Sequence, residues 1–480
     1  MFDTILVANR GEIALRVIRA CRDMGIRSVA VYSEADRKAA FVMLADEAVE
    51  IGPPSPAQSY LLIDRIIAAA KQTGAQAIHP GYGFLSENQA FARACADNGI
   101  VFIGPPPEAM AVMAGKVPAR ARMQQAGVPI VPGSGALATV DDAVAAATQI
   151  GYPVLIKASA GGGGIGMRVA ADEAELRSNL EAAQSTAQRA FGDSTVFMER
   201  YAEEPRHIEI QVLADAHGNV VHLGERECSI QRRHQKIVEE SPSPVITPEQ
   251  RKAMGDAAVT AAKAVGYVNA GTVEFIYTKG EFFFLEMNTR LQVEHPVTEL
   301  VTGIDLVVQQ IRVAAGEPLG FTQADVVQRG WAIECRVNAE DWQHDFRPAP
   351  GRVTGYHEPS GPGVRVDSAL VGPTTIPPYY DPMIAKLIVW GSDRSQAIAR
   401  MRRALLEYGI TGVTTNIPYH LAILDEPDFI AGRLTTHFIP EHPDLVEKAA
   451  RWDEERARFL RALRDPARVA AIGAAVAVTL

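Results

Sequence analysis

Two short apolar runs, residues 271–277 and 282–287, constrain the fold of this chain most. Thr278-Lys279-Gly280 lies between them and predicts a β-hairpin, because a short glycine-containing turn joins antiparallel strands. A turn centred on Gly280 places Glu274 opposite Glu286. Strand side chains alternate between the two faces of a sheet. We therefore expect one face to carry Phe282, Phe284, Glu286 and Asn288, and the other to carry Phe283, Leu285 and Met287.

The two acids of this hairpin have two interpretations. A slightly different register would leave them on a solvated face. The alternative is a site for a hard cation, because ionised carboxylates among aromatic side chains need a partner. Glu274, Glu286 and the carbonyl of Asn288 are oxygen ligands of the kind that Mg²⁺, or Mn²⁺, takes when it also holds substrate phosphates. The apolar neighbours favour the metal site.

Composition limits the remaining possibilities. A chain of 480 residues is too long for one core and predicts several domains. Its net charge of −10 gives no support for a nucleic-acid surface. The four cysteines, Cys21, Cys95, Cys228 and Cys335, are scattered and show no metal-binding spacing, which is typical of a reducing compartment. No signal peptide and no apolar run of about 18 residues is present, so we expect a cytoplasmic protein that does not enter the membrane.

The first 110 residues alternate predicted strands and helices, which indicates a doubly wound parallel sheet of the Rossmann-like α/β class. Strands are expected at 4–8, 28–32, 48–51, 77–79 and 101–103, and helices at 11–24 and 60–71. The loops at 9–12 and 79–87 carry Arg, Glu, His and Tyr at strand ends. This crowding predicts a ligand crevice rather than simple turns.

A glycine run at residues 160–166 follows a predicted strand that contains Lys157. A dinucleotide-binding fold would need a helix here, but residues 167–169 resemble a returning strand. A Walker loop would need Lys-Ser/Thr after the glycines, and a kinase places its lysine after them. A linker is disfavoured because both flanks are apolar. We expect a glycine-rich hairpin that closes over phosphates with its bare backbone N–H groups.

A run rich in charged residues, 225–236, predicts a basic loop. Such runs are usually solvated surface. Its continuation toward the acidic hairpin favours a role in substrate binding. The last thirty or so residues predict a charged, then alanine-rich helix, interpreted as an appendage.

Several of these segments, in this order, resemble biotin carboxylase, the ATP-grasp component of acetyl-CoA carboxylase and related biotin-dependent enzymes. The matching motifs are ANRGEIALR, HPGYGFLSEN, KASAGGGGIGM, RECSIQRRHQKIVEE, EFFFLEMNTRLQVEHPVTE and ECRVNAED, and the resemblance spans about residues 2–445. It implies a mixed α/β and α+β protein with a Rossmann-like N-terminal domain at 1–113. It also implies an ATP-grasp module at 114–330, which contains a lid at about 130–203. A C-terminal domain at 331–446 and a helical tail at 447–480 would follow the module.

The resemblance implies ATP, Mg²⁺ and biotin on a separate carrier protein as cofactors and substrates. Expected ATP-binding residues are Lys116, Lys157, Gly163, Gly164, Glu199, Arg200, Tyr201, Ala202, His207, Gln231, His234, Glu274, Ile276 and Glu286. Glu274, Glu286 and Asn288 match metal ligands. The bicarbonate and biotin site is expected to contain Lys236, Arg290, Gln292, Val293, Glu294, Arg336 and Tyr82. Within it, Arg290, Glu294, Lys236 and Arg336 are the expected catalytic residues, with Glu294 as base.

The sequence also departs from the family pattern. Ile165 stands where many members have Arg or Lys, and Arg200 where some have Lys. Members that dimerise use residues matching Arg19 and Arg365, but Pro362 replaces an aromatic residue near them. We still expect a homodimer.

Expected partners are a biotin carboxyl carrier protein and carboxyltransferase subunits. The carrier should be a separate chain, because the family's biotinylated lysine lies in a Met-Lys-Met turn and no Met-Lys pair occurs here. The final acceptor depends on the carboxyltransferase: acetyl-CoA is expected, and another acyl-CoA or pyruvate is the alternative. Two rival interpretations are another ATP-grasp ligase, such as a carbamoyl-phosphate or purine-carboxylating enzyme, and a nucleotide-binding subunit without catalysis.

Overall fold

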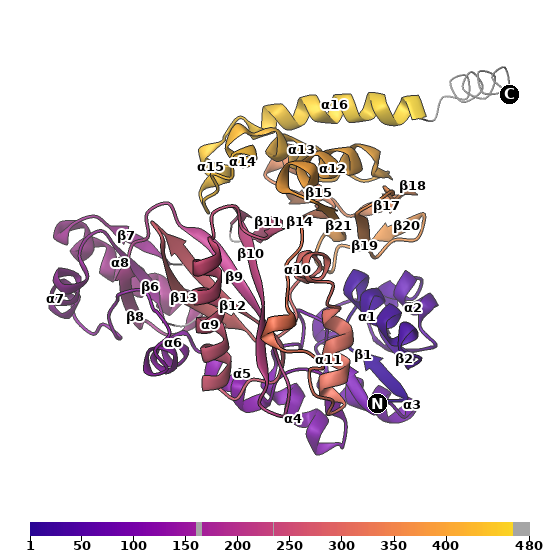
Figure 1. Ribbon diagram of the computed structural model, residues 1–480, viewed down its shortest axis with the longest axis horizontal. Coiled ribbons are helices and arrows are strands. Elements are labelled where there is room, and N and C mark those ends of the chain that lie inside the picture. The colour runs from indigo at the N-terminus through magenta and orange to yellow at the C-terminus, as the bar shows by residue number, and fades with distance from the viewer. Residues whose placement is uncertain (160–165, 234, 464–480) are drawn as a thin grey trace.

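The structure, a computed structural model, describes residues 1–159, 166–233 and 235–463. Its N-terminal part is a five-stranded parallel sheet in the order β3-β2-β1-β4-β5 (Figure 1). The strands are β1 (Thr4–Val7), β2 (Arg27–Ser33), β3 (Glu47–Gly52), β4 (Ala77–His79) and β5 (Val101–Phe102). The helices are α1 (Gly11–Asp23), α2 (Ala40–Leu44), α3 (Ile63–Thr73) and α4 (Gln89–Asp97). The predicted doubly wound sheet is confirmed.

The boundaries of this domain follow local chemistry. Helix α4 begins after Asn88, whose side chain accepts a hydrogen bond from the Phe91 amide. Helix α3 ends at Gly74, whose φ of +68° suits the left-handed cap that glycine adopts without strain. The helix expected from residue 60 begins three residues later, at Ile63, because a turn at Pro56–Gln58 occupies the preceding segment.

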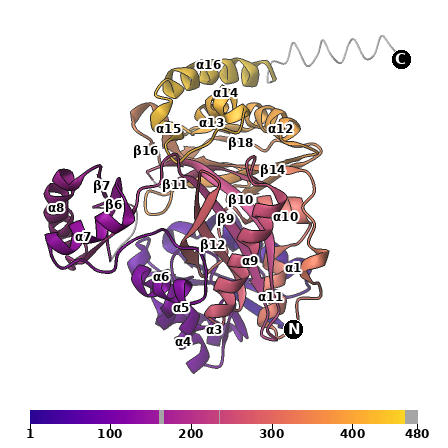
Figure 2. The ribbon, with the colours of Figure 1, turned by 60° about the vertical axis from the view of Figure 1, so that its left-hand side comes forward.

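Helices α5 (Pro107–Ala114) and α6 (Lys116–Gln125) lead to a small unit that projects to one side of the molecule (Figures 1 and 2). It consists of α7 (Val140–Ile150), β6 (Val154–Ala158), β7 (Arg168–Ala170), α8 (Glu173–Phe191) and β8 (Val196–Arg200). Its three-stranded sheet has the order β7-β6-β8 and a core of its own. The structure confirms the expected return of β7 against the strand that carries Lys157.

An eight-stranded antiparallel sheet forms the centre of the molecule, in the order β13-β12-β9-β10-β11-β14-β21-β19. These strands are β9 (Arg206–Ala214), β10 (Val220–Arg232), β11 (Gln235–Ser241), β12 (Asn269–Thr278), β13 (Glu281–Asn288), β14 (Trp331–Asn338), β19 (Val364–Ser368) and β21 (Met383–Gly391). The domain boundary expected at residue 331 falls between β11 and β14, which are hydrogen-bonded neighbours. The middle and C-terminal regions therefore share one sheet.

Helices cover this sheet and attach it to its neighbours. They are α9 (Pro248–Ala264), α10 (His295–Thr302) and α11 (Leu306–Ala314). Helix α9 packs on β9 and β10, while α10 packs on β10, β14 and β21. Leu306 and Ile311 of α11 share a buried cluster with Ile5 and Ile18 of the N-terminal domain. This common core fixes the parallel domain against the central sheet.

Two local expectations are wrong. A bulge between Glu274 and Phe275 shifts the hairpin register, so that Phe275 pairs with Phe284 and Leu285 has no partner. Phe282 and Phe284 consequently pack with Phe275 and Met287 in one apolar cluster, and not on the face of Glu286. Phe283 pairs with Ile276, so it lies on the face of Glu274 and not on that of Met287. The predicted basic loop at 225–236 is instead the end of β10 and the start of β11, and it is largely buried.

The C-terminal region completes the fold above the sheet in Figure 1. Its strands are β15 (Glu340–Asp341), β16 (Arg347–Pro348), β17 (Gly351–Val353), β18 (Gly355–His357), β20 (Thr374–Ile376) and β22 (Gly409–Thr411). Its helices are α12 (Arg394–Glu407), α13 (Ile417–Asp425), α14 (Pro427–Ile430), α15 (Phe438–Glu441) and α16 (Leu445–Leu463). Helix α16 is not an appendage at its start, because Leu445 and Ala449 belong to the domain core.

Candidate active site

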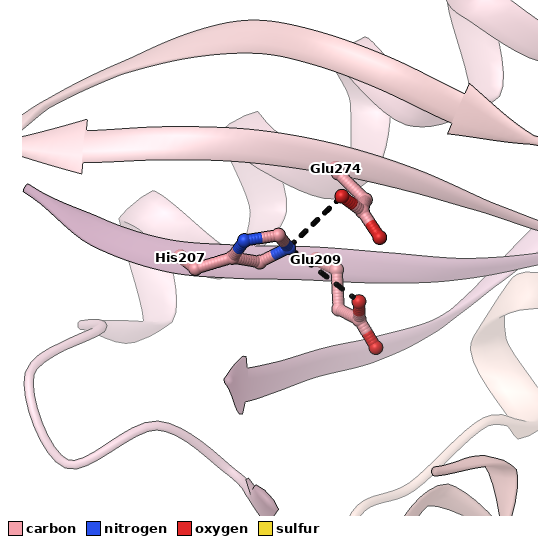
Figure 3. A group of neighbouring side chains, drawn as sticks. All are labelled: His207, Glu209 and Glu274. Carbon is pink, nitrogen blue, oxygen red and sulfur yellow. Dashed lines mark ion pairs between the residues drawn. The ribbon is translucent and has the colours of Figure 1, made fainter. Parts of the chain in front are cut away.

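One face of the central sheet carries acids from three adjacent strands. Glu274 of β12 lies opposite both Glu209 of β9 and Glu286 of β13, so the three carboxylates share a face. The predicted pairing of Glu274 with Glu286 is confirmed. His207 Nε2 lies 3.1 Å from Glu274 Oε2 and 3.8 Å from Glu209 Oε2 (Figure 3). Ile276 lies opposite His207 in the sheet. Polar groups therefore converge here although the strands are otherwise apolar.

Lys236 of β11 lies at the centre of these acids. Its Nζ is 2.5 Å from Glu209 Oε2, 2.9 Å from Glu274 Oε1 and 2.7 Å from Glu294 Oε1. Burial opposes the charged ammonium, but the three carboxylates outweigh burial and raise the pKa of Lys236 well above its usual value. Lys236 is thus a permanently charged cation in a largely buried position.

Glu294 lies between two cations at the start of α10. Besides Lys236, Arg336 of β14 contacts it, with Nη2 3.0 Å from Glu294 Oε2. Burial would raise the pKa of this carboxyl, but Lys236 and Arg336 reverse the effect and hold it below its usual range. Glu294 is therefore ionised and can accept a proton. The expected proximity of Lys236, Glu294 and Arg336 is present in the structure.

Arg336 has a second acidic partner. Its Nε lies 2.6 Å from Glu239 Oε1, and the side chain of Glu239 is fully buried. Burial raises the pKa of Glu239 to about 7 even though Arg336 opposes the change. Arg336 thus connects Glu294 to a carboxyl that is only partly ionised at neutral pH.

Arg226 is the largest fully buried side chain of the described residues, and the sequence did not point to it. Its guanidinium donates to Glu209, to Gln211 at 2.7 Å, Thr272 at 3.1 Å, Gln292 at 2.8 Å and Thr298 at 3.0 Å. It therefore holds β9, β12, α10 and the segment before α10 together beneath the site. The alternation of His207, Glu209 and Gln211 in an apolar strand was the available signal for a buried cation.

The segment between β13 and α10 receives a contact from the N-terminal domain. Glu87 Oε2 accepts a hydrogen bond from Arg290 Nε at 2.9 Å, and its Oε1 accepts from the Thr289 amide at 2.9 Å. Arg290 Nη2 also donates to Asn288 Oδ1 at 3.1 Å. Glu87, which was not among the expected site residues, thus orients the guanidinium of Arg290.

A cavity of about 670 Å³ lies beside the acids, between β13, α6 and the projecting unit. Lys116, Glu286 and Asn288 line it, together with Ser159 and Asp193. Burial, followed by the charge of Glu274, raises the pKa of Glu286. Among the described residues no cation forms an ion pair with Glu286. An oxygen-rich site with an uncompensated carboxylate fits a divalent cation, and Glu274, Glu286 and Asn288 could hold it.

Other expected nucleotide residues lie on the projecting unit and are not among the residues that line this cavity. Lys157 of β6 and Arg120 of α6 both pair with Glu199 of β8. Arg200, followed by Tyr201 and Ala202, pairs loosely with Glu281 at 3.3 Å. These residues are brought together by pairing of β6 with β8.

Three expected residues, Gly163, Gly164 and His234, lie outside the described part of the chain, as does Ile165. Gln231 Nε2 is 3.0 Å from His207 Nδ1. The hydroxyl of Tyr82 is buried and has no hydrogen-bond partner among the residues that the structure describes.

Comparison with known proteins identifies the family. Residues 1–110 match the model of the biotin carboxylase N-terminal domain, and residues 334–441 match that of the biotin carboxylase C-terminal domain. Residues 115–322 between them match the ATP-binding domain of the carbamoyl-phosphate synthase L chain. A biotin carboxylase from Nostoc sp. is 58% identical over 92% of this chain and 99% of its own length. The chain belongs to the biotin carboxylase family. As a biotin carboxylase it is a ligase, and the resemblance stated from its motifs is confirmed.

Other relatives extend the family assignment. A pyruvate carboxylase subunit from Methanothermobacter thermautotrophicus is 57% identical over 99% of this chain and 98% of its own length. A Campylobacter jejuni biotin carboxylase, solved as a β,γ-ATP complex, is 50% identical with a TM-score of 0.88 and covers 92% of this chain and 99% of its own. The biotin carboxylase domain dimer of Hydrogenobacter thermophilus 2-oxoglutarate carboxylase, solved with MgADP, ADP and bicarbonate, is 52% identical with a TM-score of 0.87, over 93% and 99% of the two chains. These neighbours confirm the ATP-grasp fold class of this biotin carboxylase.

Among its described residues, no helix has the length and apolarity needed to cross a membrane.

Proposed function

We propose that this biotin carboxylase uses ATP and bicarbonate to carboxylate the ureido nitrogen of biotin on a separate carrier protein. The observation that carries the proposal is the contact of one ionised carboxylate, Glu294, with both Lys236 and Arg336. A base held between two cations suits a reaction in which bicarbonate, an anion, loses a proton next to the negatively charged phosphates of ATP. The cavity next to it has the volume and cation-seeking acids expected of a nucleotide site.

In the first step, a bicarbonate oxygen attacks the γ-phosphorus of ATP, ADP leaves, and carboxyphosphate forms. Glu294 takes the bicarbonate proton. Arg290 offers a planar fork that can bind bicarbonate through two hydrogen bonds, and Lys236 adds positive charge on the other side. Gln292 and Val293, on the same segment, complete the pocket. Glu87 keeps Arg290 oriented before the substrate arrives.

Glu274, Glu286 and Asn288 would hold Mg²⁺, or Mn²⁺, in the cavity. When bound, the ion neutralises charge that develops on the transferring phosphoryl group. Lys116, Lys157 and His207 would bind the phosphates of ATP, and residues 199–202 the adenine. Gln231 would keep His207 oriented through its contact with Nδ1.

In the second step, carboxyphosphate yields CO₂ and phosphate. The released phosphate takes the ureido N–H proton of biotin, and the nitrogen then attacks CO₂. Arg336 stabilises the negative oxygen that develops on the ureido group. Tyr82, whose buried hydroxyl has no hydrogen-bond partner among the described residues, would lie beside the biotin ring system. The balanced reaction converts ATP, bicarbonate and biotin into ADP, phosphate, carboxybiotin and one proton, which Glu294 releases to solvent.

The carrier and a carboxyltransferase are proposed partners, and a homodimer is the proposed assembly. Arg19 is exposed, while Arg365 pairs with Glu299 at 2.7 Å and with Asp367. The four buried, unpaired cysteines support a cytoplasmic location.

Two acceptors remain candidates for the complete enzyme. Acetyl-CoA, as in fatty acid biosynthesis, follows from the motif resemblance. Pyruvate is favoured by one observation: the match to the pyruvate carboxylase subunit covers 99% of the chain, whereas the match to the Nostoc biotin carboxylase covers 92%. Purification of the native complex, followed by assays with both acceptors, distinguishes them.

The test of the proposed function is ADP release from MgATP with and without bicarbonate, together with transfer of ¹⁴C from bicarbonate to biotin. Free biotin should be carboxylated slowly and a biotinylated carrier fast. A carbamoyl-phosphate-type ligase would cleave ATP without needing biotin for product formation, and a nucleotide-binding subunit would bind ATP without turnover. Avidin detection of covalent biotin on this chain would contradict the separate carrier.

A further inference from the structure

Lys386 of β21 is a fully buried lysine that the proposed reaction does not use. In the sheet it lies opposite Arg336 of β14 on one side and opposite Asp367 of β19 on the other. Directly opposed residues of an antiparallel sheet point to the same face. Lys386 is therefore the immediate cross-strand neighbour of the arginine that contacts Glu294.

The shortest polar contact of this ammonium group is with the backbone. Nζ donates to the carbonyl oxygen of Val293 at 2.9 Å, while Glu12 Oε2 lies at 3.4 Å and Asp367 Oδ2 at 3.8 Å. Asp367 already has a two-point ion pair with Arg365, at 2.9 and 2.7 Å. Lys386 is thus not needed to neutralise Asp367, and its most direct partner is the segment that leads to Glu294.

The Val293 carbonyl belongs to the same peptide plane as the amide of Glu294. A cation bound to that oxygen fixes the plane from which the Glu294 side chain projects. Arg336 then holds the carboxylate of Glu294 at the other end, at 3.0 Å. Two cations on adjacent strands therefore hold Glu294. Lys386 binds the peptide that precedes it, and Arg336 binds its side chain.

The rest of this segment is anchored from other parts of the molecule. Glu87 of the N-terminal domain binds Thr289 and Arg290, and Arg226 of β10 donates to Gln292 at 2.8 Å. Lys386 supplies the anchor from the C-terminal region. Burying a lysine is costly, and an apolar side chain of similar volume would often stabilise the fold as well or better. The contact of Nζ with the Val293 carbonyl therefore indicates that Lys386 fixes the position of this segment, and not that it stabilises the fold.

We propose that Lys386 is a positioning residue for the bicarbonate step, holding the Val293–Glu294 peptide so that the Glu294 carboxylate meets bicarbonate in the correct orientation. This inference rests on the proposed function, which assigns the base to Glu294. It predicts that loss of the ammonium group impairs use of bicarbonate while binding of ATP is retained, because none of its contacts reaches the nucleotide cavity.

The test compares Lys386→Met with the double variant Glu12→Gln/Lys386→Met, using Glu12→Gln as the matched control. Methionine keeps the volume of the side chain and removes its charge. The single variant leaves the carboxylate of Glu12 buried without its cation, so it can fail to fold. The double variant removes both members of that pair and keeps the experiment interpretable.

For the double variant, kcat of bicarbonate-dependent ADP release should fall about 10- to 100-fold relative to Glu12→Gln, since small misplacements of a reacting group have effects of this size. The KM for bicarbonate should rise about tenfold, and the KM for ATP should change less than about twofold. The acidic limb of the pH–rate profile should move to higher pH, because a displaced Glu294 carboxylate loses its contacts with both Lys236 and Arg336. A folded double variant with the kcat, bicarbonate KM and pH profile of Glu12→Gln would overturn the proposal.

A failure of the proposed function has a different signature. In that case the unmodified protein would show no bicarbonate-dependent ADP release. Hydrogen exchange of residues 289–296 then decides the positioning role alone. Faster exchange in the double variant than in Glu12→Gln supports an anchor at Val293, and equal exchange refutes it.

Discussion

Replacing Arg336 by glutamine gives the sharpest test of how the site divides its two steps. The guanidinium contacts two carboxylates, Glu239 at 2.6 Å and Glu294 at 3.0 Å. Glutamine keeps a polar side chain at this position and removes the positive charge. If Arg336 serves the ureido oxygen of biotin, its loss should affect transfer to biotin more than cleavage of ATP.

The two contacts of Arg336 set the expected loss in the free energy of unfolding. A hydrogen bond to a charged group contributes about 1.5–3 kcal/mol, so two lost bonds give about 3–6 kcal/mol. Removing one partner of a buried ion pair costs about 3–5 kcal/mol, which agrees with the sum of the two hydrogen bonds. The pKa of Glu239 is already about 7, so this carboxyl can take up a proton when its cation is removed. We therefore expect a loss of about 3 kcal/mol at pH 7, at the lower end of both ranges.

The pH dependence of that loss has a definite sign. Without Arg336, burial should raise the pKa of Glu239 further above its unfolded value. A carboxyl whose pKa is raised by folding binds its proton more tightly in the folded state, so stability falls as pH increases through that range. The variant should become less stable from pH 7 to pH 9, as measured by thermal unfolding.

The assay follows ADP release and carboxybiotin formation side by side. Loss of one donor to a developing oxyanion costs about 10²–10³ in rate, so carboxybiotin formation should fall by this factor. Bicarbonate-dependent ADP release should fall less than about tenfold, because Lys236 still holds Glu294. Arg352→Gln, at an exposed position on β17, is the control and should change neither rate. Equal loss of both activities in a variant that still binds ATP would refute this division of roles.

Four further variants test other parts of the protein. Glu294→Gln should lose bicarbonate-dependent ADP release by at least about 10²-fold, because the base is removed, and an unchanged rate would assign the proton to another group. Glu274→Gln and Glu286→Gln should each lower kcat by at least about tenfold and raise the Mg²⁺ concentration for half-maximal rate. Glu286 has no ion-paired cation among the described residues, and after Glu274→Gln the ammonium of Lys236 keeps Glu209 and Glu294, so circular dichroism should stay unchanged in both variants. Burial raises the pKa of Glu12 to about 7, so ionisation of this carboxyl makes the folded state progressively less stable between about pH 5 and pH 7. Thermal unfolding of Glu12→Gln should not show this loss of stability between about pH 5 and pH 7. Identical pH profiles of the unfolding temperature in the variant and the unmodified protein would show that Glu12 does not titrate in this range.

The hairpin register was predictable because its determinants are local. The turn at Lys279-Gly280 fixes which residues pair, and Glu274 does lie opposite Glu286. The bulge that leaves Leu285 unpaired depends on how Phe284 packs into the core, where it joins Phe275 and Met287. No periodicity within the strand carries that information, so the predicted faces are wrong at Phe282, Phe283 and Phe284.

Residues 225–236 differ from the predicted loop because their charged side chains are largely buried in β10 and β11. Charged runs usually lie on the surface, but the partners of Arg226 lie on β9, β12, α10 and the segment before it. Glu87, likewise, is about 200 residues from the arginine that it orients. Such pairs become visible only when the tertiary structure brings distant segments together. The residues matched through the motifs were found because each motif is continuous in sequence.

The continuous sheet across residue 331 has a consequence for any attempt to build chimaeras of this protein. Exchanging the C-terminal region between relatives at that boundary would not replace a detachable module. It would replace three strands of a common sheet, and β11 must then form its hydrogen bonds with a foreign β14. A chain shortened to residue 330 would instead expose β11 as an open strand edge, which is a template for association with other chains. The projecting unit of β6, β7 and β8 has a separate sheet and core, so it is the part of this molecule that can be exchanged whole.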